Sequence, residues 1–157
     1  EEPYSIAITI LDKLEKNSEW DVKILASDVS FSMLDKAKLG LYSPQRIGPL
    51  SDNQRAKYLI RKRDDDSLCH QVNPVLRNII QFAYLNLMDN FPFKGPLDFI
   101  FCRNVMIYFD KETQQKLVQK FCDVLSPGGI LFTGHSESLT GIKHRFKYIR
   151  PTIYQKT

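Results

Sequence analysis

Long apolar runs and metal-ligand motifs are both missing from this 157-residue sequence. Its strongest apolar stretch, residues 97–109, is interrupted by Asp98, Arg103 and Asn104, whereas a membrane-spanning helix needs about 20 apolar residues in a row. The three cysteines form no CxxC pair and the three histidines lack regular ligand spacing, so we expect no metal site. A net charge of +4 does not demand a nucleic-acid partner. Membrane-spanning and collagen-like chains are excluded, and a globular protein of one-domain size remains.

The first residues contain neither an initiator methionine nor a signal peptide. Glu1-Glu2-Pro3-Tyr4 leads directly into apolar residues at helical spacing over residues 6–14. Pro3 suits the first turn of a helix, and two acids there complement the helix dipole. We therefore expect a helix whose preceding loop has been cut away, in a chain that is a fragment of a longer protein.

Strand and helix patterns alternate along the chain. Short apolar runs that end in a polar residue are typical of buried parallel strands, and apolar residues three or four apart indicate helices. The predicted strands are residues 22–28, 79–87, 97–102 and 130–133; the predicted helices are 30–38, 51–58 and 111–125, with a turn at 17–19, a helix stop at 126–129 and a closing hairpin at 146–154. This order predicts an α/β fold with a mostly parallel sheet.

The middle of the chain is less regular. Glycines and prolines break residues 39–49, and residues 59–82 are predicted to form a hairpin or small insertion. Asp64-Asp65-Asp66 is interpreted as a solvated turn, because the later ligands of a calcium loop are absent. These aspartates offset Arg61-Lys62-Arg63, which argues against a phosphate-binding stripe.

Polar residues at strand ends form the candidate site, since ligands of open α/β sheets bind beyond the carboxyl ends of the strands. Asp28 is placed to hold the two hydroxyls of a ribose, or alternatively to cap the next helix. Arg103-Asn104 is either part of the same site or a surface loop. Tyr108 is either a pocket residue or an aromatic core residue, and Cys102 is interpreted as core.

Four strings carry a resemblance to a known family. They are EEPYSIA at residues 1–7, ASD at 26–28, FCRNVMIYF at 101–109 and GHSE at 134–137. Together they closely resemble the CheR-type chemotaxis receptor methyltransferases, over the whole chain but most loosely at 40–82. The resemblance implies a Rossmann-like methyltransferase sheet with a small inserted β-subdomain, and a cytoplasmic enzyme that uses S-adenosylmethionine to methylate glutamate side chains of bacterial chemoreceptors, leaving S-adenosylhomocysteine.

The resemblance also implies a role for each matching position. The implied cofactor-binding residues are Glu2 in the cofactor loop, Asp28 at the ribose, Asn86 and Leu87 at the adenine, and Arg103 and Asn104 at the methionine end. The implied catalytic residues are Arg103, which steers the glutamate, and Tyr108, near the reactive methyl group. A catalytic base is not expected, because a glutamate carboxylate is already ionised at neutral pH.

The family has segments that this chain lacks: an N-terminal helical domain, a first central strand and a glycine-containing loop, all before the Glu-Glu-Pro-Tyr string. The missing strand belongs between the strands that end at Asp28 and Cys102, so two apolar edges are expected to be unpaired. We expect a partial catalytic domain over residues 1–157 that is poorly stable, swaps segments with another copy, or closes the gap in another way. Residues 59–82 contain no glycine, which argues against binding of a receptor tail there.

Two other functions share the predicted fold. A nucleic-acid methyltransferase is disfavoured, because residues 103–106 stand where an Asn/Asp-Pro-Pro-aromatic loop is expected. A non-catalytic signalling or scaffold module of the same family remains an alternative. The favoured partners are the cytoplasmic helices of methyl-accepting chemoreceptors, with no nucleic acid and no membrane insertion.

Overall fold

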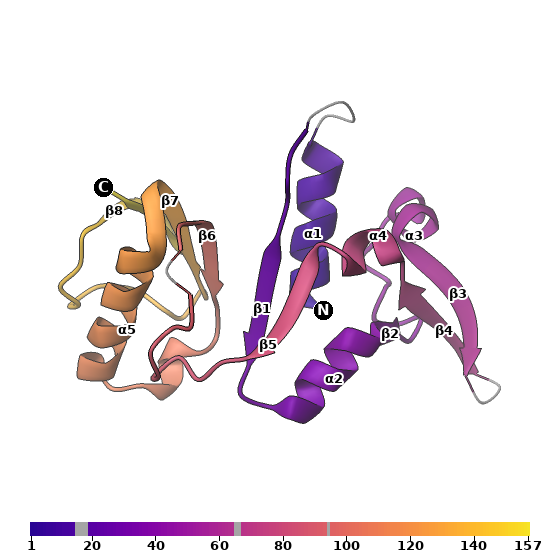
Figure 1. Ribbon diagram of the computed structural model, residues 1–157, viewed down its shortest axis with the longest axis horizontal. Helices are drawn as coiled ribbons and strands as arrows, with labels where there is room; N and C mark the ends of the chain where they lie inside the picture. The colour runs from indigo at the N-terminus through magenta and orange to yellow at the C-terminus, as the bar shows by residue number, and fades with distance from the viewer. Residues whose placement is uncertain (15–18, 65–66, 94) are drawn as a thin grey trace. The chain divides into compact units, whose positions relative to one another are not determined.

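The computed structural model describes residues 1–14, 19–64, 67–93 and 95–157, residue 64 by its backbone alone. The chain divides into two compact units, Glu1–Asn86 and Leu87–Thr157 (Figure 1). Each unit has its own core of buried apolar side chains. The turns predicted at 17–19 and 64–66 lie partly outside the described residues.

The first unit is built on a pair of parallel strands, β1 (Ile24–Asp28) and β5 (Ile80–Tyr84), paired from Ile24 with Ile80 to Asp28 with Tyr84. Helix α1 (Glu2–Lys13) packs on this pair through one apolar face, which includes Tyr4, Ala7 and Ile8. Helix α2 (Phe31–Leu39) follows β1 and ends at Gly40, whose φ of 62° is left-handed. Both strands therefore end at one edge, where the sequence predicted a site.

A second, antiparallel sheet is inserted in this unit, in the order β2-β4-β3. Its strands are β2 (Leu41–Tyr42), β3 (Leu59–Asp64) and β4 (Ser67–Val72). Helix α3 (Asp52–Tyr58) begins with a reciprocal capping box between Ser51 and Gln54, and α4 (Pro74–Arg77) leads back to β5. The predicted hairpin is present, whereas β2 and α4 are too short to leave a periodic signal in the sequence.

The second unit contains a four-stranded sheet in the order β6-β7-β9-β8. Parallel strands β6 (Leu97–Cys102) and β7 (Leu125–Thr133) are connected through the 3-10 helix η1 (Met106–Tyr108) and α5 (Lys111–Val124). The antiparallel strands β8 (Phe146–Arg150) and β9 (Ile153–Lys156) form the predicted closing hairpin. Side chains of α5 that are at most 3% exposed line the core: Leu117, Val118, Phe121 and Cys122.

The structure corrects one detail of the sequence prediction. Helix α5 ends at Val124, and β7 already begins at Leu125, so residues 126–129 lie within β7, where its pairing with β6 shifts register between Leu97 and Phe99. The pairing directions agree with the prediction: β1-β5 and β6-β7 are parallel, and the inserted sheet and the closing hairpin are antiparallel.

The α/β class of the sequence prediction is confirmed, and both parallel pairs fit a Rossmann-like sheet. In the described part of the chain, no strand pairs with both β1 and β6, which belong to separate sheets. No helix of these residues is long and apolar enough to cross a membrane.

Candidate functional site

Asp28 lies at the carboxyl end of β1 and is exposed. Its Oδ1 accepts a hydrogen bond from the backbone N–H of Ser30 at 2.8 Å. Ser30, not Asp28, caps α2, since its hydroxyl accepts from the N–H of Met33. The second oxygen of Asp28 accepts no hydrogen bond from the described residues. The helix-cap alternative for Asp28 is therefore wrong, and one carboxylate oxygen is open to a ligand.

Two stacked aromatic rings lie at the same strand ends. The rings of Phe31 and Tyr84 have centroids 4.9 Å apart and an interplanar angle of 12°. Tyr84 pairs in register with Asp28, and the two residues are 67% (Phe31) and 47% (Tyr84) exposed. Exposed aromatic faces are platforms on which purine rings stack. Sequence reasoning missed this pair, although an apolar ring at the end of a strand and another at the start of the next helix were visible signals.

Glu2 lies in the first turn of α1, not in a loop, which corrects the sequence prediction. Pro3 favours helix at this point, and the acid complements the dipole at the helix N-terminus. Because α1 runs opposite to β1, its N-terminal end lies toward the carboxyl ends of β1 and β5 (Figure 1). Within the first unit, Glu2 and Asp28 are thus at the same edge.

Asn86 is the last residue of the first unit and Leu87 is the first residue of the second, and both are half-buried. Leu87 packs against the core of the second unit. The ammonium group of Lys120 on α5 donates to the carbonyls of Leu87, Met88 and Asp89 at 3.1, 2.8 and 2.9 Å. Lys120 thus holds the segment that carries Leu87. Nothing in the sequence pattern had indicated this role, because the contact spans more than 30 residues.

Arg103, Asn104 and Tyr108 follow β6 within the second unit. Arg103 and Asn104 are exposed, and Asn104 has a left-handed φ of 58°. Tyr108, on η1, is 80% exposed, so it is not the core residue that the sequence allowed as an alternative. Cys102 is 5% exposed, which confirms its interpretation as core.

A buried carboxylate shapes this loop. Glu137, 5% exposed, accepts backbone N–H hydrogen bonds from Asn104, Val105, Met106 and Gly134 at 2.6–2.8 Å. Three consecutive amides of one loop thus converge on a single side chain from another loop. The GHSE string had contributed to the family resemblance, but sequence reasoning gave Glu137 no role.

Gly134 has no room for a side chain beside this carboxylate. A Cβ there would lie 2.5 Å from Oε2 of Glu137 and 3.0 Å from the backbone nitrogen of Asn104. The hydroxyl of Thr133 donates to the backbone oxygen of Glu137 at 2.8 Å, and the N–H of Glu137 donates to the oxygen of Gly134. The turn after β7 therefore holds Glu137 in place.

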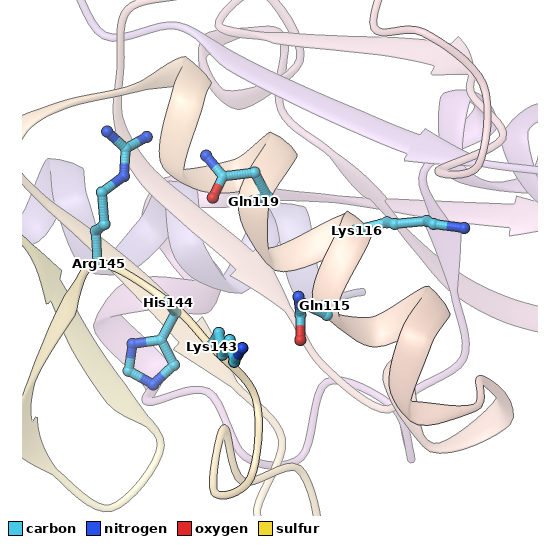
Figure 2. Close-up of a pocket in the computed structure, with 6 residues that line it drawn as sticks. All are labelled: Gln115, Lys116, Gln119, Lys143, His144 and Arg145. Carbon is cyan, nitrogen blue, oxygen red and sulfur yellow. The ribbon is translucent and has the colours of Figure 1, made fainter.

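The predicted residues are distributed over the two units: Glu2, Asp28 and Asn86 belong to the first, and Leu87, Arg103, Asn104 and Tyr108 to the second. A cleft of about 530 Å³ on the second unit contains none of them (Figure 2). It lies between α5 and residues 143–145, and two of its basic side chains are already paired, Lys116 with Glu112 and Arg145 with Asp123. The described residues contain no cluster of three side chains suited to a metal ion.

The family model and the curated relatives that match this sequence agree on one family. The sequence model described as "CheR methyltransferase, SAM binding domain" matches residues 1–155. A chemotaxis protein methyltransferase of Borreliella burgdorferi is 44% identical over 99% of this chain and 54% of its own length. That of Escherichia coli is 40% identical over 98% of this chain and 54% of its own length. The chain thus spans about half the length of the curated relatives it matches.

A solved structure, that of PKMT2 from Rickettsia typhi, covers 85% of this chain and 24% of its own, with 18% identity and a TM-score of 0.43.

S-adenosylmethionine is the cofactor of this domain family. The side chains at the strand ends have the chemistry that this molecule needs. The open oxygen of Asp28 suits ribose hydroxyls, and the stacked rings beside it offer an apolar surface. The exposed guanidinium of Arg103 and amide of Asn104 suit the carboxylate and amino groups of the methionine moiety.

The family assignment rests on both the comparisons and the strings that the sequence presented at the outset. The matched region extends over almost the whole chain and includes every candidate residue. This chain belongs to the CheR methyltransferase family, within its SAM-binding domain.

Proposed function

We propose that this chain is the cofactor-binding part of an enzyme that transfers a methyl group from S-adenosylmethionine to glutamate side chains of bacterial chemoreceptors. The observation that carries the proposal is the placement of Asp28 and of Arg103-Asn104 at the carboxyl ends of parallel strands, with exposed side chains. The relatives that match over nearly the whole chain are named chemotaxis protein methyltransferases, which supports the receptor as substrate.

The proposed reaction needs no catalytic base from the protein, because the glutamate carboxylate is already ionised at neutral pH. When bound, S-adenosylmethionine would supply an electrophilic methyl group: a glutamate oxygen would bond to the methyl carbon as its bond to sulfur breaks, giving a methyl ester and S-adenosylhomocysteine with no proton released. The chain's own residues then have to bind, align and exclude water. We assign the ribose to Asp28, with Glu2 at the same edge, the adenine to Asn86 and Leu87, and the methionine end to Arg103 and Asn104.

Arg103 and Tyr108 are the proposed catalytic residues. A guanidinium attracts an incoming carboxylate and orients it through charge-assisted hydrogen bonds. Tyr108 is presented by η1 with its ring exposed, which suits a group that helps to enclose the methyl group. We place the partner glutamates on the cytoplasmic helices of chemoreceptors, and the enzyme in the cytoplasm.

Cofactor binding tests the first step. We expect Asp28→Ala to weaken S-adenosylhomocysteine binding about tenfold or more, because it removes a charged acceptor from the ribose. The matched control is Asp35→Ala on α2, an exposed acid whose carboxylate oxygen lies 3.8 Å from the ammonium nitrogen of Lys38. Calorimetry of the wild type and both variants gives the dissociation constants. Equal affinity in Asp28→Ala and Asp35→Ala would contradict the assignment of Asp28.

Methyl transfer tests the second step. The full-length protein is incubated with radiolabelled S-adenosylmethionine and a chemoreceptor cytoplasmic fragment, with and without its acceptor glutamates. We expect base-labile label on the fragment that keeps the glutamates. Tight cofactor binding without any label would instead support the non-catalytic signalling module. In a parallel incubation with DNA and RNA in place of the fragment, label on the nucleic acid would support the nucleic-acid methyltransferase.

A further inference from the structure

Glu137 stands out among the charged side chains of the second unit because it is buried and, among the described residues, its carboxylate accepts hydrogen bonds from four backbone N–H groups. Its Oε1 accepts from Val105 and Met106, each at 2.7 Å. Its Oε2 accepts from Asn104 at 2.8 Å and from Gly134 at 2.6 Å. Each oxygen thus accepts two hydrogen bonds, and these replace the hydrogen bonds to water that the carboxylate loses when it is buried.

The position of this carboxylate links two loops at the same sheet edge. Cys102 at the end of β6 pairs in register with Thr133 at the end of β7. Asn104 and Gly134, in the loops that follow these strands, both donate to Glu137, whose side chain thus joins one loop to the other. In an open α/β sheet this edge is where ligands bind.

The conformation of the loop after β6 depends on this acceptor. Asn104 adopts a left-handed φ that costs a non-glycine residue free energy, and Glu137 compensates for it by binding the N–H of Asn104 and of the two residues that follow. The same bonds supply acceptors to amides at the start of η1, which have no intrahelical partner. Gln114 fixes the other side of η1 by donating to the carbonyls of Met106 and Phe109.

We infer that Glu137 is a positioning residue of the cofactor site: its carboxylate holds the backbone of residues 104–106 so that Arg103 and Asn104 are presented to the methionine end of the cofactor. This inference rests on the proposed function for the role of Arg103 and Asn104. Glu137 itself, being buried, acts through these residues and does not touch the ligand.

Glu137→Gln tests the inference in the full-length protein. The amide keeps the size of the side chain but replaces one oxygen with a donor group, so two of the four N–H groups lose their acceptor. We expect S-adenosylhomocysteine to bind about tenfold more weakly or worse, and the amides of residues 104–106 to exchange faster with deuterium. Glu137→Asp, which keeps the charge on a shorter side chain, is expected to fall between Gln and wild type.

The matched control is Tyr154→Phe. It removes the acceptor of the buried N–H of Leu139 and leaves the four bonds of the Glu137 carboxylate in place. We expect Tyr154→Phe to lower the melting temperature while cofactor affinity stays within about twofold of wild type. If Glu137→Gln lost no more affinity than Tyr154→Phe at similar loss of stability, Glu137 would be only a structural residue and the inference would be overturned.

A measurement on the wild type keeps the inference testable even if Glu137→Gln does not fold. The amides of Asn104, Val105, Met106 and Gly134 are expected to exchange slowly without any ligand, and exchange as fast as in an open loop would overturn the inference. Failure of the wild type to bind S-adenosylhomocysteine would contradict the proposed function instead, while slow exchange would still support the anchoring by Glu137.

Discussion

Gly134 shows how one missing side chain makes room for a charged group. Its φ is not left-handed, so a larger residue at this position would cause a steric clash but no backbone strain. We expect Gly134→Ala to destabilise the protein by about 1–3 kcal/mol, because the new methyl group would displace the carboxylate of Glu137. Urea denaturation measures the loss.

The control for this change is Gly48→Ala. Gly48 also lacks a left-handed φ, and its Cβ would lie 3.3 Å from the oxygen of Gln45, which needs only a small shift. Little change is expected there. Equal losses of stability in Gly134→Ala and Gly48→Ala would show that the Glu137 carboxylate does not fill the space beside Gly134.

Single residues also mark the limit of what the sequence predicted. Asp28, Arg103 and Asn104 became candidates because polar residues that end apolar strands stand out from their neighbours. Glu137 and Lys120 act on backbone groups about 30 residues away, so no local pattern identifies them. Their roles depend on the fold that brings these groups together.

Helices α1 and α3 are joined by a network around Asp12. Its carboxylate accepts hydrogen bonds from Gln54, Tyr58 and Lys57 at 2.9, 2.7 and 3.2 Å. The bonds from Gln54 and then Tyr58 lower the pKa of Asp12 below its ordinary value. A lowered pKa in the folded state means that the ionised carboxylate stabilises the fold.

We therefore expect Asp12→Asn to cost about 1 kcal/mol at neutral pH. The stabilisation by the wild-type carboxylate is fully present above its unfolded pKa and is lost as the pH falls through its folded pKa. The difference between wild type and variant should therefore shrink in acid, which urea denaturation across the acidic range measures. Asp21→Asn, at an exposed acid outside this network, is the control, and a pH-independent difference for Asp12→Asn would contradict the argument.

The elements that the sequence predicted are those with a clear apolar period or a strong cap. The helices predicted at 51–58 and 111–125 are both confirmed, and they begin with side-chain caps, Ser51 for α3 and Asp110 for α5. The strand that begins at Leu125 was predicted to begin at residue 130, because Ser126-Pro127-Gly128-Gly129 resembles a loop. These four residues belong to β7 because the strand pairs with β6 and β9. Strand partners, unlike helices, are set by residues far away in sequence.

At the scale of the chain, the two units have separate cores. One contains Leu76 and Tyr58, and the other contains Leu117 and Leu131, each with an exposed fraction of 0%. β1 and β6 belong to different sheets, so no hydrogen-bonded ladder runs from one unit to the other in the described part of the chain. The segment-swapped oligomer that the family resemblance led us to expect stays a prediction, which sedimentation of the purified chain would test.

Two separate cores predict two separable steps of unfolding. Leu76→Ala and Leu117→Ala each remove a side chain that is 0% exposed, and each should cost its own unit about 2–5 kcal/mol. Hydrogen exchange resolved along the chain should then show faster exchange of residues 1–86 in Leu76→Ala and of 87–157 in Leu117→Ala. If either variant accelerated exchange equally in both ranges, the chain would unfold as one cooperative unit. The cores would then depend on each other for stability, despite the absence of a shared sheet.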